Sequence, residues 1–178
     1  MLNCIAIGGV PASGKSYLIN ALYNNLDNHI NFKSGLIRGH YIKKYNLLIV
    51  GIYNTFKKFK GTDLLSMSVH NDFKQLIALN KYNIIFEGDR LFTNNMLDYI
   101  NQYYKLVVIV LKVDDKILVK RHKDREDTQN SKFLKGRNTK IANIMSNENL
   151  SIMVRDNNNS SDMSHIYNTM VDIIKKKR

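Results

Sequence analysis

One short motif has residue types and spacing that could hold the phosphate chain of a nucleotide. Residues 9–16 are Gly-Val-Pro-Ala-Ser-Gly-Lys-Ser and match G-x-x-x-x-G-K-[ST] at every fixed position. Glycines let backbone N–H groups turn inward around phosphates, and a following helix adds the positive end of its dipole. Lys15 would neutralise the β- and γ-phosphates, and Ser16 would complete a magnesium site. The alternative is a glycine-rich turn without a ligand, but the apolar run before the motif and the helical pattern after it favour a phosphate loop.

The nucleotide expected at this motif is ATP, together with Mg²⁺. A phosphate loop alone does not distinguish a kinase from a GTPase or an ATP-driven motor. A chain of 178 residues leaves little room for GTPase switch motifs, and no N-K-x-D sequence stands where guanine recognition would need it. The residues expected to bind ATP are Gly9, Val10, Pro11, Ala12, Ser13, Gly14, Lys15, Ser16 and Tyr17, joined by Arg121 and Arg125.

A second feature is the apolar run Ile84–Phe86, which ends in the acid Glu87. A carboxylate at the end of a strand beside the phosphate loop can orient Mg²⁺ directly or through water, so Glu87 is expected to share the metal with Ser16. Arg90 is expected to face the phosphoryl group during transfer. The alternative is an acidic turn in which Asp89 pairs with Arg90, but the intact phosphate loop favours the functional interpretation.

Asp63 has two interpretations. It follows Gly61-Thr62 at the expected start of a helix, where a carboxylate commonly caps the first turn and contributes about 1 kcal/mol. It could instead be the general base that accepts a proton from the hydroxyl group being phosphorylated. The two roles compete, because a carboxylate engaged in capping is a poorer base.

Residues 120–140 contain eight Lys or Arg side chains against three acids. Gly136 and the scarcity of apolar residues predict a mobile loop, here a basic lid at about residues 121–140 that closes over the phosphates. Arg121 and Arg125 lie four residues apart on one helix face and can point at one anion, so both are expected to act as catalytic residues on the phosphoryl group during transfer. The alternative is a solvated basic loop. Residues 157–159, three Asn in a row, could contact the adenine ring or form a plain loop.

Apolar segments alternate between the periods of strands and helices, with no internal repeat and no linker. The pattern predicts one α/β domain over residues 1–178, with three α/β/α layers and a mainly parallel sheet. The expected strands are Asn3–Val10, Leu36–Tyr41, Leu47–Tyr53, Asn83–Phe86, Leu106–Val113 and Leu150–Val154. The expected helices run from Lys15 to Leu26, from Thr62 or Asp63 to Asn80, over Thr93–Gln102, from Asp114 to Lys123, and from a cap at Ser161 to the C-terminus. Leu64, Met67, Phe73 and Ile77 are expected in the core.

The amino-acid composition indicates which classes of binding partner and which cellular compartment to expect. A net charge of +12 favours a polyanion, although the abundance of Lys and Asn also fits a bias towards AT-rich codons. Cys4 is the single cysteine, so a reducing, cytoplasmic compartment is expected, which would be the host cytoplasm for a viral protein. No apolar run approaches the ~18 residues needed to cross a bilayer, and no membrane partner is expected.

Together these segments resemble the viral P-loop kinases that phosphorylate 5-hydroxymethyluracil in DNA. The resemblance covers most of the chain, including the phosphate loop, Phe59–Met67 with its Gly-Thr-Asp-x-Leu-Ser sequence, Phe86–Leu91, and Lys135–Lys140. It implies an ATP-dependent P-loop phosphotransferase with an alcohol acceptor, the hydroxymethyl group of a DNA base. It also implies that Asp63 is the general base rather than a cap, with Glu87 as the next candidate.

A DNA substrate implies backbone contacts from a basic surface and access to a base in the major groove or flipped out. The cations expected on the acceptor side are Lys33, Arg38, Lys43, Lys44, Lys57, Lys58 and Lys60. Tyr41, Tyr45, Tyr53, Phe56 and Phe59 could stack on a displaced base or pack in the sheet and hairpin. Two other functions remain open: a deoxynucleoside monophosphate kinase that acts on free nucleotides, and a nucleic-acid-binding protein that binds ATP without catalysis.

Overall fold

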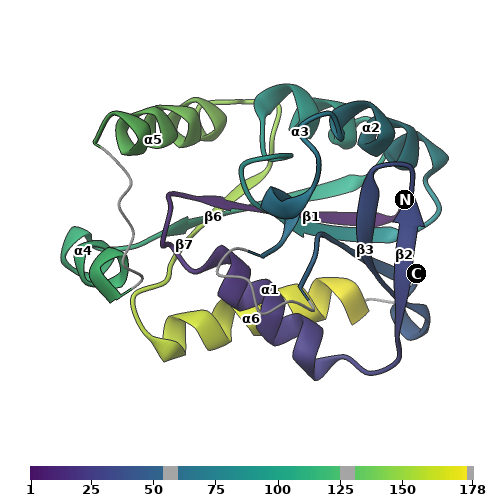
Figure 1. Cartoon of the computed structure of the whole chain (residues 1–178), viewed down its shortest axis with the longest axis horizontal. Coiled ribbons are helices and arrows are strands. Elements are labelled where there is room, and N and C mark those ends of the chain that lie inside the picture. Colours follow the sequence, from purple (N-terminus) through teal and green to yellow (C-terminus); the bar gives the residue numbers. More distant parts are fainter. Residues whose placement is uncertain (54–59, 125–130, 176–178) are drawn as a thin grey trace.

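A seven-stranded sheet forms the centre of the computed structural model, which describes residues 1–53, 60–124 and 131–175 (Figure 1). The strands are β1 (Asn3–Gly9), β2 (His29–Ser34), β3 (Ile37–Ile42), β4 (Leu47–Val50), β5 (Asn83–Glu87), β6 (Lys105–Lys112) and β7 (Ile152–Asp156). Their order is β2-β3-β4-β5-β1-β6-β7. The five strands from β4 to β7 in this order are parallel, and β3 and β2 extend one edge antiparallel. The predicted mainly parallel sheet is confirmed.

Helices cover both faces of the sheet, which confirms the predicted three layers (Figure 1). One face carries α1 (Lys15–Asn25) and α6 (Ser160–Lys175). The other carries α2 (His70–Leu79), α3 (Asn94–Asn101) and α5 (Ser131–Met145). The remaining helix, α4 (Asp115–Asp124), follows β6 and buries none of its residues.

Strand β1 shows why the central strands are apolar throughout. Ile5 and Ile7 pack against the α1–α6 layer, whereas the alternating residues Cys4 and Ala6 pack against the layer of α2, α3 and α5. Since both faces of the parallel sheet are covered, β1 buries every residue from Cys4 to Gly9. Fully burying one Ile or Leu contributes about 1.5–3 kcal/mol, so this continuous run fixes β1 in the centre.

The order of the strands creates a binding position at the carboxyl end of β1. From β1 the chain passes through α1 towards β2, β3 and β4, on one side. From β5, its neighbour, the chain passes through α3 to β6, on the other side of β1. Open α/β sheets bind ligands where neighbouring connections diverge in this way, outside the carboxyl ends of the strands.

The edge strand β2 was not predicted. Its residues are mostly polar and exposed, because β2 pairs only through β3 and packs little of its surface, so it has no apolar pattern. The strand predicted to run to Tyr53 ends earlier, at Val50. Gly51 bends the chain there with a φ of 125°, and Ile52 forms an isolated bridge with Gly61.

The helix predicted from Thr62 or Asp63 is also different. A single 3₁₀ turn, η2 (Thr62–Leu64), is followed by an irregular stretch, and α2 begins only at His70. Asp63 therefore does not cap α2, whose N-cap position is Val69. Met67 was expected in the core but is 77 % exposed, whereas Phe73 and Ile77 are buried as predicted.

The basic region contains a helix where a mobile loop was expected. Residues 131–145 form α5, which buries Ile141 and Ile144 against the sheet. Gly136 lies within α5 with open space around it, and a mid-helix glycine costs only about 1 kcal/mol relative to alanine. Two apolar anchors at the end of the helix outweigh that cost.

Smaller differences concern the ends of elements. The last helix starts at Ser160, and the Asn159 side chain, rather than the predicted Ser161, accepts a hydrogen bond from the first turn. Thr93 caps α3 by accepting from the Met96 N–H group, one residue before that helix begins. In the part of the chain that the structure describes, every helix is too short or too polar to cross a membrane.

Candidate functional site

The phosphate loop joins the carboxyl end of β1, a central strand of the sheet, to α1. Ala12 and Gly14 both have positive φ, 61° and 95°, which turns the backbone of the loop back over the start of the helix. A side chain at Gly14 would also collide with the amide nitrogen of Asn157, so glycine is required there. The first N–H groups of α1 therefore border the loop, as anion binding requires.

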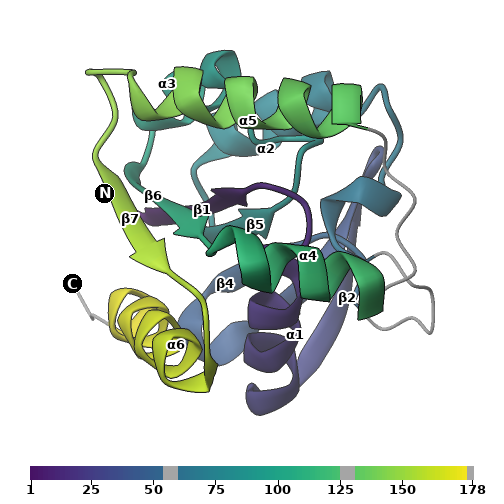
Figure 2. The same ribbon diagram turned by 90° about the vertical axis from the view of Figure 1, so that its left-hand side faces the viewer.

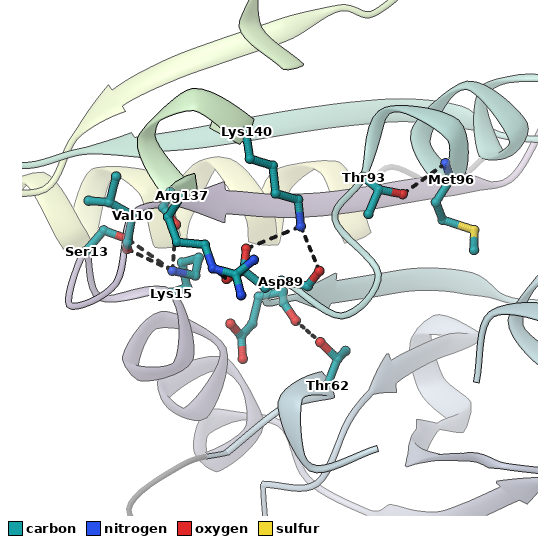
Figure 3. Close-up of polar contacts among 11 residues, drawn as sticks. Val10, Ser13, Lys15, Thr62, Asp89, Thr93, Met96, Arg137 and Lys140 are labelled. Carbon is teal, nitrogen blue, oxygen red and sulfur yellow. Dashed lines mark hydrogen bonds and ion pairs between the residues drawn. The ribbon is translucent and has the colours of Figure 1, made fainter. Parts of the chain in front are cut away.

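Lys15 folds back onto its own loop (Figure 3). Its ammonium group donates to the carbonyl oxygens of Gly9 and Val10, at 2.8 Å and 3.0 Å, and lies 3.4 Å from Ser13 Oγ. Its positive charge also lowers the pKa of Glu87 and of Asp63, which opposes the effect of burial on both. Lys15 thus lies between the loop and two acids.

Two side chains from other elements hold the loop in place. Asn157, after β7, is buried and donates through Nδ2 to the carbonyl oxygen of Ser13 at 2.7 Å. Arg121 of α4 donates to the carbonyl oxygens of Ala12 and Asn157, at 3.4 Å and 2.8 Å. Asn157 was predicted as an adenine contact or a plain loop residue, and its supporting contact has no sequence signal. Arg125, predicted to act with Arg121, lies outside the described residues.

Glu87 ends β5 directly beside β1, where it pairs in register with Ile7. Its side chain is buried, and its Oε1 accepts hydrogen bonds from Ser16 Oγ at 3.1 Å and from the Tyr53 hydroxyl at 3.4 Å. Burial raises the pKa of Glu87 to about 7, although the charge of Lys15 and these two hydrogen bonds oppose the shift. Glu87 is therefore a carboxylate that a cation would stabilise strongly.

Asp63 lies on η2, next to the loop that follows β5. Thr62 Oγ1 donates to the backbone oxygen of Glu87 at 2.5 Å, which fixes η2 against the end of that strand. The Asp63 side chain is exposed to the cavity described below. Surrounding protein partly desolvates it, and this effect with the charge of Asp89 raises its pKa, while Lys15 lowers it.

Arg90 and Asp89 do not pair with each other, although the alternative of an acidic turn predicts that pair. Each contacts a different partner. Arg90 Nη2 donates to the backbone oxygen of Asp63 at 3.0 Å. Its Nη1 is buried without a hydrogen-bond partner in residues 1–53, 60–124 and 131–175, a costly state that an anionic ligand would relieve. Asp89 instead pairs with Arg137 and Lys140 of α5, at 2.9 Å and 3.4 Å (Figure 3).

One cavity of about 1060 Å³ joins these groups. Ligand pockets usually measure about 300–1,000 Å³, so this one lies at the upper end of that range. Its lining includes Pro11, Ala12, Gly14, Lys15, Ser16, Tyr17, Asp63, Glu87, Arg90 and Arg121. Of the four other residues predicted to bind ATP, Gly9, Val10 and Ser13 are absent from that lining, and Arg125 lies outside the described residues.

A comparison with family models identifies the class of the protein. The model of an AAA domain (AAA_18) matches residues 5–163. The chain belongs to this AAA domain family. The family is one of P-loop NTPases and kinase-like proteins, so the predicted broad class of P-loop kinases is confirmed. No curated protein matches the chain.

The oxygen donors of this AAA domain fit Mg²⁺. Mg²⁺ is commonly held by one or two protein oxygens while phosphates and water supply the rest. Ser16 and Glu87 already lie within 3.1 Å of each other, and the Glu87 carboxylate is buried without an ion pair among the described residues. No group of three or more His, Cys, Asp or Glu in that part of the chain could hold a metal alone. A cation here would therefore need the phosphates of a nucleotide as ligands.

Among the cations predicted on the acceptor side of the AAA domain, those of β2, β3 and the turn before β4 lie at two opposite ends of the β3–β4 hairpin. Arg38 and its partner Lys33 lie towards the carboxyl end of β4, since Gly39 pairs with Val50, and Lys60 lines the cavity. Lys43 and Lys44 form the turn before β4, at the opposite edge of the sheet from the phosphate loop. Their expected place on the acceptor side is wrong. Lys57 and Lys58 lie outside the described residues.

The aromatic residues considered for stacking are packing residues where they are described. Tyr41 stacks edge-on against Tyr82, and Tyr45 packs at the margin of the α1–α6 layer. Tyr53 is buried and donates its hydroxyl to Glu87, so it supports the acid. Phe56 and Phe59 lie outside the described residues.

Proposed function

We propose that this protein is an ATP-dependent kinase that phosphorylates the hydroxymethyl group of 5-hydroxymethyluracil in DNA. The observation that carries the proposal is one cavity lined by the phosphate loop, by the acids Glu87 and Asp63, and by Arg90. Family membership supports a phosphotransferase in general. The acceptor comes from the resemblance of the Gly-Thr-Asp-x-Leu-Ser and Glu-Gly-Asp-Arg segments to viral DNA kinases.

At the donor end, the loop amides and the start of α1 bind the triphosphate of ATP. Lys15 exchanges its carbonyl partners in the loop for the β- and γ-phosphates, a short movement because all these groups border the same turn. Ser16 and Glu87, which lie within hydrogen-bond distance of each other, would hold Mg²⁺. When bound, this ion neutralises charge on the phosphates and orients them.

Arg121, Asn157 and Met163 line the cavity on the side of β6 and β7, away from Asp63. We assign this side to the adenine ring, because Arg121 and Asn157 contact the phosphate loop there. Arg121 then supports the donor nucleotide through the loop carbonyl of Ala12. Its predicted contact with the transferring phosphoryl group stays a prediction.

At the acceptor end, Asp63 accepts the proton of the hydroxymethyl group as its oxygen attacks the γ-phosphorus. A new oxygen–phosphorus bond forms, the bond to the β-phosphate oxygen breaks, and ADP leaves. The raised pKa of Asp63 makes its carboxylate a stronger proton acceptor than an ordinary aspartate. Arg90, whose Nη1 lacks a protein partner among the described residues, binds the charge of the phosphoryl group.

The surroundings of the two acids favour this division of roles. Glu87 is buried beneath the loop and accepts from Ser16, which suits a group that orients a metal. Asp63 is exposed to the cavity, which suits a group that contacts an acceptor hydroxyl. Glu87 is the second candidate for the base.

DNA as the substrate is supported by the charge of +12 and by the place of the reacting groups inside a cavity. A base stacked in a duplex cannot reach a site that is walled by several loops. The target nucleotide would therefore have to be flipped out of the helix or presented in a single strand.

The test compares acceptors with γ-labelled ATP and Mg²⁺. An oligonucleotide with one 5-hydroxymethyluracil should be labelled, whereas the same oligonucleotide with thymine, which lacks the acceptor oxygen, should not. Mass analysis of the nucleosides should place one phosphate on the modified base. Label only on free deoxynucleotides would refute DNA as the acceptor and support a nucleotide kinase. DNA binding without transfer to any hydroxylated acceptor would indicate a non-catalytic protein.

A further inference from the structure

Helix α5 presents an aromatic and two cationic side chains on one face. Phe133, Arg137 and Lys140 are spaced four and three residues apart, so they lie one above another along the helix. Phe133 and Arg137 line the cavity. The Arg137 guanidinium lies against the Phe133 ring, with its central carbon 4.5 Å from the ring centroid. Phe133 keeps 38 % of its surface exposed.

The position of this face is fixed by Asp89. Arg137 contacts Asp89 Oδ2 through Nε at 2.9 Å, and Lys140 donates to the Asp89 backbone oxygen at 2.9 Å. A guanidinium carries five N–H donors in a planar fork, and the contact with Asp89 uses the one on Nε. Because Asp89 stands between Glu87 and Arg90 in the chain, α5 is held against the loop that carries these two site residues.

The face belongs to the acceptor side of the cavity. Figure 2 looks onto the end of the molecule where the phosphate loop lies, and it shows the first turns of α5 on the side of β2, with α6 and β7 on the other side. The proposed adenine position lies towards α6 and β7. Met67, 77 % exposed after η2, lines the same cavity and adds a second apolar side chain.

We propose that Phe133 and Arg137 form a platform for the acceptor nucleotide, in which its base stacks on Phe133 and its backbone phosphate binds Arg137. The identity of that nucleotide rests on the proposed function. The Arg137 guanidinium lies over the Phe133 ring, and the part of Phe133 that stays exposed borders the cavity, where a nucleobase offers a flat apolar surface that can stack on it. A guanidinium fork matches the oxygens of a phosphate. The pair therefore selects a nucleotide unit over a small free alcohol.

The first test measures binding of a fluorescein-labelled oligonucleotide with one 5-hydroxymethyluracil, at a salt concentration that suppresses non-specific contacts. Stacking on one aromatic side chain corresponds to about 5- to 150-fold in affinity, so Phe133→Ala should weaken binding within that range. Met145→Ala is the matched control, because Met145 is also 38 % exposed on α5 but does not line the cavity. It should change affinity by less than about twofold, and both variants should keep the wild-type KM for ATP.

The second test separates the phosphate contact from stacking. Arg137→Ala should raise KM for the oligonucleotide about tenfold, as expected for a lost charge-assisted contact, and leave KM for the nucleoside 5-hydroxymethyldeoxyuridine unchanged. Arg137→Lys should restore only part of the loss, since lysine has no planar fork. Equal effects on the oligonucleotide and the nucleoside would overturn the phosphate contact.

The outcomes distinguish this inference from the proposed function. Transfer by the wild type with unchanged Kd and KM in Phe133→Ala would overturn the platform and keep the kinase. Weaker oligonucleotide binding by Phe133→Ala without transfer by the wild type would support the platform and refute the kinase. If free nucleotides alone are phosphorylated, a raised KM for them in Phe133→Ala supports the platform, and an unchanged KM overturns it.

Discussion

The buried acid Glu87 should make the stability of the protein depend on pH in a way that one substitution removes. Its pKa rises from 4.5 to about 7 in the folded protein because burial disfavours the charged form. Between these values the folded state binds more protons at this site than the unfolded state does. The free energy of unfolding must therefore fall as pH rises through this window. Glu87→Gln keeps the shape and stays neutral, so it removes this contribution.

The size of the effect follows from the two pKa values. With 4.5 for the unfolded and about 7 for the folded state, the raised pKa of Glu87 lowers the free energy of unfolding by about 1 kcal/mol at pH 5 and by about 3 kcal/mol at pH 8. The free energy of unfolding of Glu87→Gln should therefore rise by about 2–3 kcal/mol relative to that of the wild type between these pH values. For a chain of this size, that corresponds to roughly 5–10 °C in Tm.

The assay is thermal unfolding of both proteins from pH 5 to pH 8, without nucleotide or Mg²⁺. The Tm of Glu87→Gln should exceed that of the wild type increasingly as pH rises, and the same variant should lose Mg²⁺-dependent transfer. Asp63→Asn is a useful control, because the nearby Asp63 charge contributes to the raised pKa of Glu87 and its removal should shift the window downward. A constant difference in Tm across the whole range would refute the reasoning about Glu87.

Three further substitutions test the site. Lys15→Ala should abolish phosphoryl transfer but leave retention on a DNA column largely unchanged; an equal loss of both would contradict its role at the phosphates. Asp63→Asn should lower kcat by ~100-fold or more with little change in KM for ATP, and unfolding of the variant would instead indicate a structural role. Asn157→Ala leaves the Ser13 carbonyl without its 2.7 Å donor, so stability should fall by about 1–3 kcal/mol and KM for ATP should rise. An unchanged melting temperature would show that the bond contributes nothing.

The phosphate loop and the end of β5 could be predicted from sequence because their signals are local. The order of glycines and Lys15 describes a backbone shape within eight residues, and β1 and β5 are apolar on both faces because both are covered. Glu87 stands at the point where an apolar run ends. In a parallel sheet such a residue lies at the carboxyl edge beside its neighbours, so its place follows from the strand alone.

The supports of the site could not be predicted, because they depend on contacts between distant segments. Asn157 reaches Ser13 across 144 positions of the chain, and nothing in three consecutive asparagines distinguishes the one that is buried. The helix predicted to start at Thr62 or Asp63 does not start there, for a related reason. Thr62 Oγ1 donates to the backbone oxygen of Glu87 instead of accepting from the first turn of a helix, and this tertiary bond outweighs the local tendency to start a helix there.

Asp89 shows how one turn residue can connect separate parts of the site. In the sequence it is an acid between Glu87 and Arg90, and a pair with the adjacent arginine is the simplest local expectation. In the fold it pairs with two cations of α5, which leaves Arg90 to contact the backbone of Asp63. The positions of Asp63, Arg90 and α5 therefore all depend on the few residues after β5. A change in this turn would alter the acceptor side as a unit, whereas the phosphate loop is held independently by Arg121 and Asn157.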